Sequence, residues 1–142
     1  MKFQSLVLKI PLLTRPKKNS QEIKRNRRTG KLFIGQSNRY DAYNYECKFY
    51  LNQWMRENLT NSIGFVPLPI DCPVNLKLTF YVPDRRRRDI ANLVNAIQDV
   101  LVEVGILEDD NFTIVKSLDG TRIIYEKGRE ETIVEITRLE DE

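Results

Sequence analysis

Residues 74–105 read VNLKLTFYVPDRRRRDIANLVNAIQDVLVEVG, and this stretch predicts a strand, a charged turn and a helix in that order. Apolar and polar residues alternate over 74–82, which is typical of a strand. From Ile90 onward, apolar residues recur every three or four positions until Gly105, and glycine commonly follows the last turn of a helix. A strand followed by an amphipathic helix favours a sheet with helices packed on it.

Three further segments have the composition of strands: residues 2–10, 121–126 and 132–139. Residues 127–130, KGRE, are interpreted as a hairpin loop between the last two. Ser37 can cap a helix that reaches about Leu59 and carries an aromatic stripe, which we interpret as core rather than as a base-stacking platform. No internal repeat or linker divides the chain. We therefore expect one domain, residues 1–142, of the α/β (α+β) class, with a mixed sheet and two main helices packed on it.

Residues 11–36 form a polar, basic arm with too few apolar residues for a core of their own. The turn RTGK at 28–31 separates two short extended pieces, so we expect a loop that contains a hairpin. Residues 1–40 hold 11 Lys and Arg against one Glu, whereas residues 99–142 hold 5 against 13 Asp and Glu. This asymmetry favours a polyanionic partner, although a basic arm without a binding role is the alternative. The candidate phosphate contacts in the arm are Lys17, Lys18, Arg25, Arg27 and Arg28.

The composition excludes several kinds of catalysis. The chain has no His, which rules out Ser-His-Asp and Cys-His catalysis and histidine-based nucleases. Its two cysteines, Cys47 and Cys72, form neither a disulfide framework nor a zinc-binding pattern. Any acid–base or metal chemistry must therefore use Asp, Glu, Lys or water.

The sequence shows no sign of a membrane span or of a secretion signal. No apolar run approaches the roughly 20 residues that a bilayer-spanning helix needs. The first residues, MKFQSLVLKIP, alternate charged and apolar positions and lack a small-residue cleavage site, so they favour a strand. We therefore expect a cytoplasmic protein with no membrane partner.

Carboxylates stand at both ends of the second predicted helix. Asp89 precedes the helix, and Asp109 and Asp110 follow it. Carboxylate oxygens are ligands that Mg²⁺ prefers, and a bound magnesium ion can activate water for phosphodiester hydrolysis. A helix of about 16 residues is about 24 Å long, so these groups could share a metal only if the chain turned back after Gly105 or a second subunit supplied the other half. The alternative interpretations are that Asp89 is a helix N-cap and that residues 108–110 are an ordinary acidic turn.

Four adjacent arginines come directly before Asp89: Arg85, Arg86, Arg87 and Arg88. Guanidinium groups bind phosphate oxygens in a bidentate fork. Cations beside a carboxylate site also reduce the repulsion between that site and DNA. The arginine run is therefore a candidate phosphate clamp next to a candidate metal ligand.

Residues 83–115, PDRRRRDIANLVNAIQDVLVEVGILEDDNFTIV, resemble the central segment of the RusA family of Holliday junction resolvases. The likeness is dense over this segment and looser over the rest of the chain, including the RPKKNS stretch, the TGKLF turn and the closing strands, which resemble the phage and Gram-positive branch. Members are small, phage-derived, homodimeric endonucleases that use magnesium. The resemblance implies a RusA-like fold, four-way junction DNA as substrate, a homodimer, Mg²⁺ as cofactor with Mn²⁺ as a substitute, and a DNA-associated protein of phage or prophage origin.

The resemblance also assigns roles to single residues. It implies that Asp89, Asp109 and Asp110 are the catalytic, metal-binding residues, with Asn92 and Asp99 in support. It further implies that the segment after the helix returns to the sheet beside the strand end, which can bring the acidic pair back toward Asp89.

Two positions differ from the family pattern. Ala91 stands where a second Asp is expected, and Asn95 stands where a Lys often follows. Alanine can neither coordinate a metal nor accept a proton. Two alternatives follow: a site built from the remaining carboxylates with help from Asn92, or a junction-binding protein that cuts weakly or not at all. An RNA-binding protein is a third alternative, for which the sequence has no recognisable aromatic motif.

Overall fold

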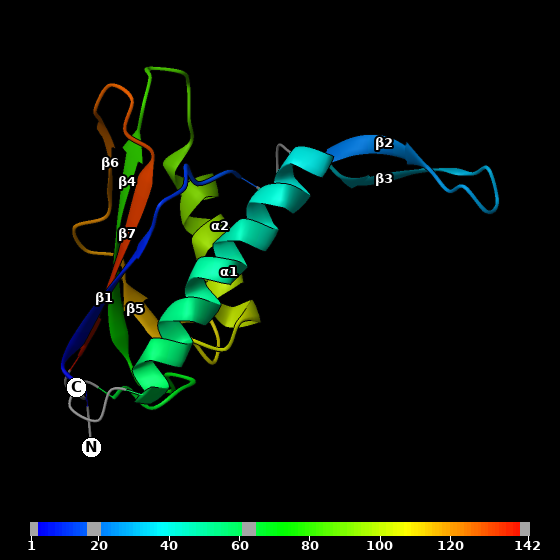
Figure 1. Cartoon of the computed structure of the whole chain (residues 1–142). Helices are drawn as coiled ribbons and strands as arrows, with labels where there is room; N and C mark the ends of the chain where they lie inside the picture. Colours follow the sequence, from blue (N-terminus) through cyan, green and yellow to red (C-terminus); the bar gives the residue numbers. More distant parts are fainter. Residues whose placement is uncertain (1–2, 17–20, 61–64, 140–142) are drawn as a thin grey trace.

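The computed structural model describes residues 3–16, 21–60 and 65–139. It contains two helices and seven strands in these ranges (Figure 1). In chain order they are β1 (Ser5–Ile10), β2 (Gln21–Arg25), β3 (Leu32–Gln36), α1 (Asn38–Thr60), β4 (Val74–Val82), α2 (Ile90–Glu103), β5 (Val115–Ser117), β6 (Arg122–Tyr125) and β7 (Glu131–Arg138).

Strand β4 is the centre of a five-stranded mixed sheet (Figure 1). On one side it pairs with β7, which runs antiparallel to it and pairs in turn with β1. On the other side it pairs with two short parallel strands, β5 against its first residues and β6 against its last. This sheet, with the two helices, confirms the predicted fold class.

The segment 127–130 is not the hairpin loop that the strand pattern predicted. β6 and β7 both pair with residues 79–81 of β4, so β4 lies between them. The connection passes over the end of β4, where Glu126 N donates to Val82 O at 3.0 Å. Two strand-like segments joined by a short polar loop usually form a hairpin, which is why a hairpin was predicted. Nothing in the sequence of these two segments indicates that β4 lies between them.

Both helices cover one face of the sheet and enclose the core (Figure 1). Alternate residues of β4 point into this core, as the period of two in a strand requires. The buried core residues of these elements include Leu76, Leu78 and Phe80 of β4, Leu93, Ile97 and Leu101 of α2, and Tyr40, Tyr43, Cys47 and Leu51 of α1. The prediction that the aromatic stripe of this helix belongs to the core is therefore confirmed. Neither helix in the described part of the chain has the length and hydropathy needed to cross a bilayer.

The arm contains the predicted hairpin. β2 and β3 pair antiparallel as a separate two-stranded sheet that extends away from the rest of the molecule beyond the start of α1 (Figure 1). At its tip the Asn26 side-chain oxygen accepts hydrogen bonds from the backbone N of Arg28 (2.8 Å) and of Thr29 (3.2 Å). Gly30 follows with a φ of +75°, a conformation that glycine adopts without strain. This turn places the basic residues of the arm at the end of a projecting ribbon.

Candidate active site

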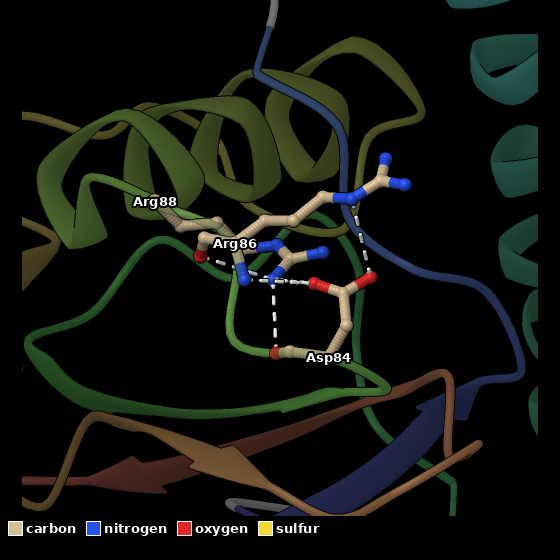
Figure 2. A network of polar contacts seen from close by, with 3 residues as sticks. All are labelled: Asp84, Arg86 and Arg88. Carbon is tan, nitrogen blue, oxygen red and sulfur yellow. Dashed lines mark hydrogen bonds and ion pairs between the residues drawn. The ribbon is translucent and has the colours of Figure 1, made fainter.

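Asp84 organises the loop between β4 and α2. Its Oδ1 accepts hydrogen bonds from the backbone N of Arg86 (3.0 Å) and from Arg88 Nη1 (2.8 Å). Arg88 Nη1 also donates to the carbonyl oxygens of Asp84 and Arg86, both at 3.3 Å (Figure 2). Arg86 Nε also lies 3.8 Å from Asp84 Oδ2, so the Asp84 carboxylate and mainly the Arg88 guanidinium hold the loop that ends in Asp89.

The four arginines of the run are not equivalent. The Arg88 side chain is only 15% exposed because it points back into the loop, whereas the Arg86 side chain is 84% exposed. Arg85 lies over the ring of Tyr125, with its guanidinium carbon 4.9 Å from the ring centroid. Arg87 is exposed as well. We infer that Arg88 has mainly a structural role, and that the other three present their charge to a ligand.

Asp84→Asn is expected to lower the thermal stability of the protein in a pH-dependent way. The hydrogen bond from Arg88, and after it the one from the Arg86 backbone, lowers the pKa of Asp84 below its ordinary value. A carboxyl group with a lowered pKa in the folded state adds stability above its unfolded pKa of about 3.9, and this contribution is lost as the pH falls through the folded pKa. The difference in Tm between wild type and variant should therefore be largest at neutral pH and shrink below about pH 4.

Thermal melts followed by circular dichroism over this pH range measure the effect. The matched control is Asp119→Asn, which changes an exposed carboxyl group on the connection between β5 and β6. A Tm difference for Asp84→Asn that stays constant down to low pH would contradict the role assigned to the Asp84 carboxylate.

Asp89 is both the N-cap of α2 and part of a cavity wall. Its backbone is extended, with φ −104° and ψ 115°, and its Oδ1 accepts a hydrogen bond from Ala91 N at 3.0 Å. The residue is exposed and lines a cavity of about 530 Å³. The cavity is also lined by Thr14, Pro16, Arg87, Arg88, Asn92 and Leu93. The capping bond occupies one carboxylate oxygen, so the capping and ligand-binding interpretations of Asp89 are compatible.

Thr14 and Pro16 belong to this cavity although the sequence did not single them out. The segment after β1 is held there by Thr14, whose Oγ1 lies 2.6 Å from Thr132 Oγ1 on β7. Both threonines are buried. The position of Thr14 depends on the pairing of β1 with β7, a contact between residues more than 100 positions apart, so no local pattern could have indicated it.

The acidic pair lies in a compact turn of its own. Asp109 Oδ1 accepts a hydrogen bond from Asp110 N at 2.7 Å, and its Oδ2 accepts one from Asn111 Nδ2 at 3.0 Å. Asp110 is exposed. Just before the turn, Glu108 N donates to Ile70 O at 3.0 Å, which ties the turn to the segment that leads into β4. The acidic pair therefore lies near the beginning of β4.

Asp89 and the acidic pair are at opposite ends of the molecule's central strand and of α2. Asp89 follows the end of β4, whereas the turn at 109–110 lies near its start. The 14 residues of α2 between them span about 21 Å. The segment after α2 does return to the sheet, as β5, but it does so beside the beginning of β4, so it does not bring the acidic pair toward Asp89 within one chain. Among the described residues, no three Asp, Glu or Cys side chains are grouped so that they could hold a metal ion.

Comparison with known proteins identifies the family. The family model for endodeoxyribonuclease RusA matches residues 14–137. The chain belongs to the RusA family. Among the curated relatives, a crossover junction endodeoxyribonuclease RusA of Aquifex aeolicus is 33% identical over 67 residues, which are 47% of this chain and 51% of the relative. A protein of the same name from Shigella sonnei is 37% identical over 60 residues, 41% of this chain and 50% of the relative. The chain thus spans about half the length of the curated relatives it matches.

The two positions that differ from the RusA pattern lie in a groove separate from the Asp89 cavity. This groove has a volume of about 410 Å³ and is mainly apolar. It is lined by Ile90, Ala91, Val94, Asn95, Gln98, Leu118 and Thr121. Position 91 is exposed in the first turn of α2, so a carboxylate there would extend from the helix on a different side from the Asp89 cavity.

Asp99, the other supporting residue implied by the RusA likeness, lies away from Asp89. It is ten residues further along the chain, about 15 Å along α2. Its charge acts on Tyr40 of α1, whose pKa is raised by burial first and then by the carboxylates of Glu103 and Asp99. Asn92, by contrast, lines the same cavity as Asp89. The structure therefore brings Asn92 to Asp89, whereas Asp99 is exposed further along α2, on a side from which its charge reaches Tyr40 of α1.

The arm residues of this RusA-family chain form a second basic region. Arg25 ends β2, and Arg27 and Arg28 lie in the hairpin turn, all three exposed. Lys17 and Lys18 lie outside the described residues. The exposed arginines of the arm and of the loop before α2 are both available to bind phosphate.

Proposed function

We propose that this chain is a divalent-metal-dependent endodeoxyribonuclease that cleaves four-way DNA junctions as a homodimer. The observation that carries the proposal is the position of Asp89, an exposed carboxylate in a cavity whose wall includes Arg87 and Arg88. Membership of the endodeoxyribonuclease RusA family and relatives named crossover junction endodeoxyribonuclease support the reaction class. A single catalytic domain over residues 1–142, acting on DNA in the cytoplasm, is part of the same proposal.

The distance between the carboxylates supports a site shared by two subunits. In one chain, Asp89 and the pair Asp109 and Asp110 lie at opposite ends of α2. In a twofold dimer, Asp89 of one subunit can lie beside Asp109 and Asp110 of the partner subunit, and the same symmetry operation then builds a second, identical site. Two equivalent sites correspond to the two symmetry-related strands that resolution of a junction must cut.

The donor groups fit a hard divalent cation. Asp89 and Asp110 are exposed carboxylates, and Asp109 adds a third beside Asp110. Such oxygen ligands suit Mg²⁺, with Mn²⁺ as a substitute. When bound, the ion would lower the pKa of a coordinated water and offset negative charge on the phosphate.

The residues around Asp89 have distinct tasks in this mechanism. Arg87, on the cavity wall, can donate two parallel hydrogen bonds to phosphate oxygens and so hold a DNA strand against the carboxylate. Arg88 keeps the loop in place through Asp84. Asn92, three residues after Asp89 and therefore on the same side of α2, can donate its amide to the same phosphate.

A junction-cleavage assay tests the proposed function. With Mg²⁺, we expect the wild type to cut a synthetic four-way junction and to leave linear duplex of the same sequence intact. Ala91→Asp restores the carboxylate that the RusA pattern has at this position, so a variant that cuts where the wild type does not would identify an inactivated enzyme. Binding of the junction without cutting at any concentration of Mg²⁺ or Mn²⁺ would contradict the proposal and favour a non-catalytic junction-binding protein, the alternative to which Ala91 points.

A further inference from the structure

The hairpin of β2 and β3 carries an apolar face that is open to solvent. Ile23 is 74% exposed, Ile34 71% and Leu32 62%. Ile23 pairs with Ile34, and the next pair on the same face joins Arg25 with Leu32. Directly paired residues lie on the same face of a two-stranded sheet, so these three apolar side chains form one patch with Arg25 beside it. We call this patch the arm apolar face.

Such a patch is unusual on a ribbon of this kind. A single two-stranded hairpin is marginally stable alone in water, and exposed apolar side chains gathered on one surface commonly mark a binding site. The hairpin projects from the body (Figure 1), and an ion pair between Lys24 Nζ and Asp41 Oδ2 at 3.5 Å connects it to the first turn of α1. Within the described residues the arm apolar face therefore lies on a projecting element rather than against the core.

The charge around the face indicates what it binds. Residues 21–36 contain five Lys and Arg and one Glu, a net charge of +4. A partner must therefore combine negative charge with apolar surface. Intact duplex DNA hides its base faces by stacking, whereas the branch point of a four-way junction exposes base pairs that have no stacked neighbour on one side once the junction opens. The flanking phosphates supply the negative charge.

The connection of the arm supports the same partner. Pro16 lines the Asp89 cavity, and β2 begins five positions later in the sequence, at Gln21. A DNA strand in the cavity thus lies within a few residues of the arm. Proteins that bend DNA commonly insert Ile, Leu or Phe side chains between base pairs while arginines bind the adjacent phosphates.

We propose that the arm apolar face inserts at the branch point of a four-way junction and holds the base pairs there apart. Ile23, Leu32 and Ile34 contact the exposed base faces, and Arg25, Arg27 and Arg28 bind the phosphates on either side. The inference rests on the proposed function and adds to it the surface that recognises the branch.

The test replaces Ile23 and Ile34 by Thr in the full-length protein. Threonine keeps the branched shape that favours strands, so the hairpin is retained, while the face becomes polar and the charge is unchanged. A junction with 2-aminopurine at the branch point reports unstacking as a rise in fluorescence. We expect wild type to produce this rise and the double variant to lose most of it, with about tenfold weaker junction binding and an unchanged salt dependence. Val7→Thr, at an exposed position of β1, is the matched control and should behave as wild type.

Each contrary result has a distinct meaning. Wild-type protein that binds and cuts the junction without a rise in fluorescence would overturn the inference and leave the proposed function intact. A wild type that neither binds nor cuts four-way junctions would remove the proposed function itself. If sedimentation without DNA shows that the double variant loses a dimer that the wild type forms, the arm apolar face packs against a second copy of the chain and the inference is wrong.

Discussion

Mixed dimers of an Asp89→Asn subunit and an Asp110→Asn subunit are expected to nick four-way junctions that neither variant cuts alone. In each homodimer of a single variant, both shared sites lack one carboxylate, and we expect a loss of cleavage of about a thousandfold or more. In the mixed dimer, one site carries both substitutions and the other carries none. The intact site should cut one strand, so nicked product should appear without the paired incision. Asparagine is a good N-cap, so Asp89→Asn should keep the start of α2 intact.

The control is a mixed dimer in which the same two substitutions are on one subunit; we call it the mirror-image dimer. Wild type combined with an Asp89→Asn, Asp110→Asn double variant has one substituted residue in each shared site, so it should be inactive. If each site were built from one chain, the two results would be exchanged: the wild-type subunit would remain active and the first mixture would not. Co-expression with two different affinity tags and sequential purification isolates each mixed dimer. Nicking by the mirror-image dimer alone would overturn the shared site.

Replacing Arg25, Arg27 and Arg28 by Gln is expected to flatten the salt dependence of junction binding. Each lost phosphate contact should reduce the slope of log K against log salt concentration by about 0.9, so the triple variant should lose up to about 2.7. At low salt, affinity should fall by roughly a hundredfold. Because the turn is held by Asn26 and Gly30, these substitutions should leave the hairpin in place.

Arg56→Gln is the matched control for charge. Arg56 is exposed toward the end of α1, away from the hairpin. Binding measured by fluorescence anisotropy over a series of salt concentrations should give this variant the wild-type slope. An unchanged slope for the triple variant would show that the arm arginines do not contact phosphate in the complex.

Much of the fold could be predicted from residue periodicity. The helices at 38–60 and 90–103 and the strands at 74–82 and 131–138 follow patterns of period 3.6 and 2 that depend on local sequence. The hairpin of the arm was indicated by its turn residues in the same way. Strand partners could not be predicted, because alternation gives the face that a strand buries but not its neighbours. For this reason β6 and β7 resembled a hairpin, although β4 lies between them.

The same distinction holds for the candidate site. Asp89, its arginines and the acidic turn are local features of the sequence, and the structure has them next to the elements expected. The part of Thr14 in the cavity wall depends on the pairing of β1 with β7, and the structural role of Arg88 depends on its side-chain conformation. The length of the helix indicated that Asp89 and the acidic pair lie far apart unless the chain turned back after Gly105. The chain does return to the sheet, but as β5 beside the beginning of β4, at the end away from Asp89.

Strand β4 lies between Asp89 and the acidic pair Asp109 and Asp110, and this position has a consequence for how the junction is cut. In the proposed twofold dimer, the first site lies at Asp89 of one subunit and the second lies at that subunit's own Asp110. The separation between the two incisions is then set by the distance between these residues in a single chain, between which lie β4 and the helix α2, about 21 Å long. Because β4 is hydrogen-bonded on both sides, this spacing is rigid. This fixed spacing would thus select which junctions are resolved. A DNA branch whose scissile phosphates could not reach that spacing would be bound without being cut on both strands.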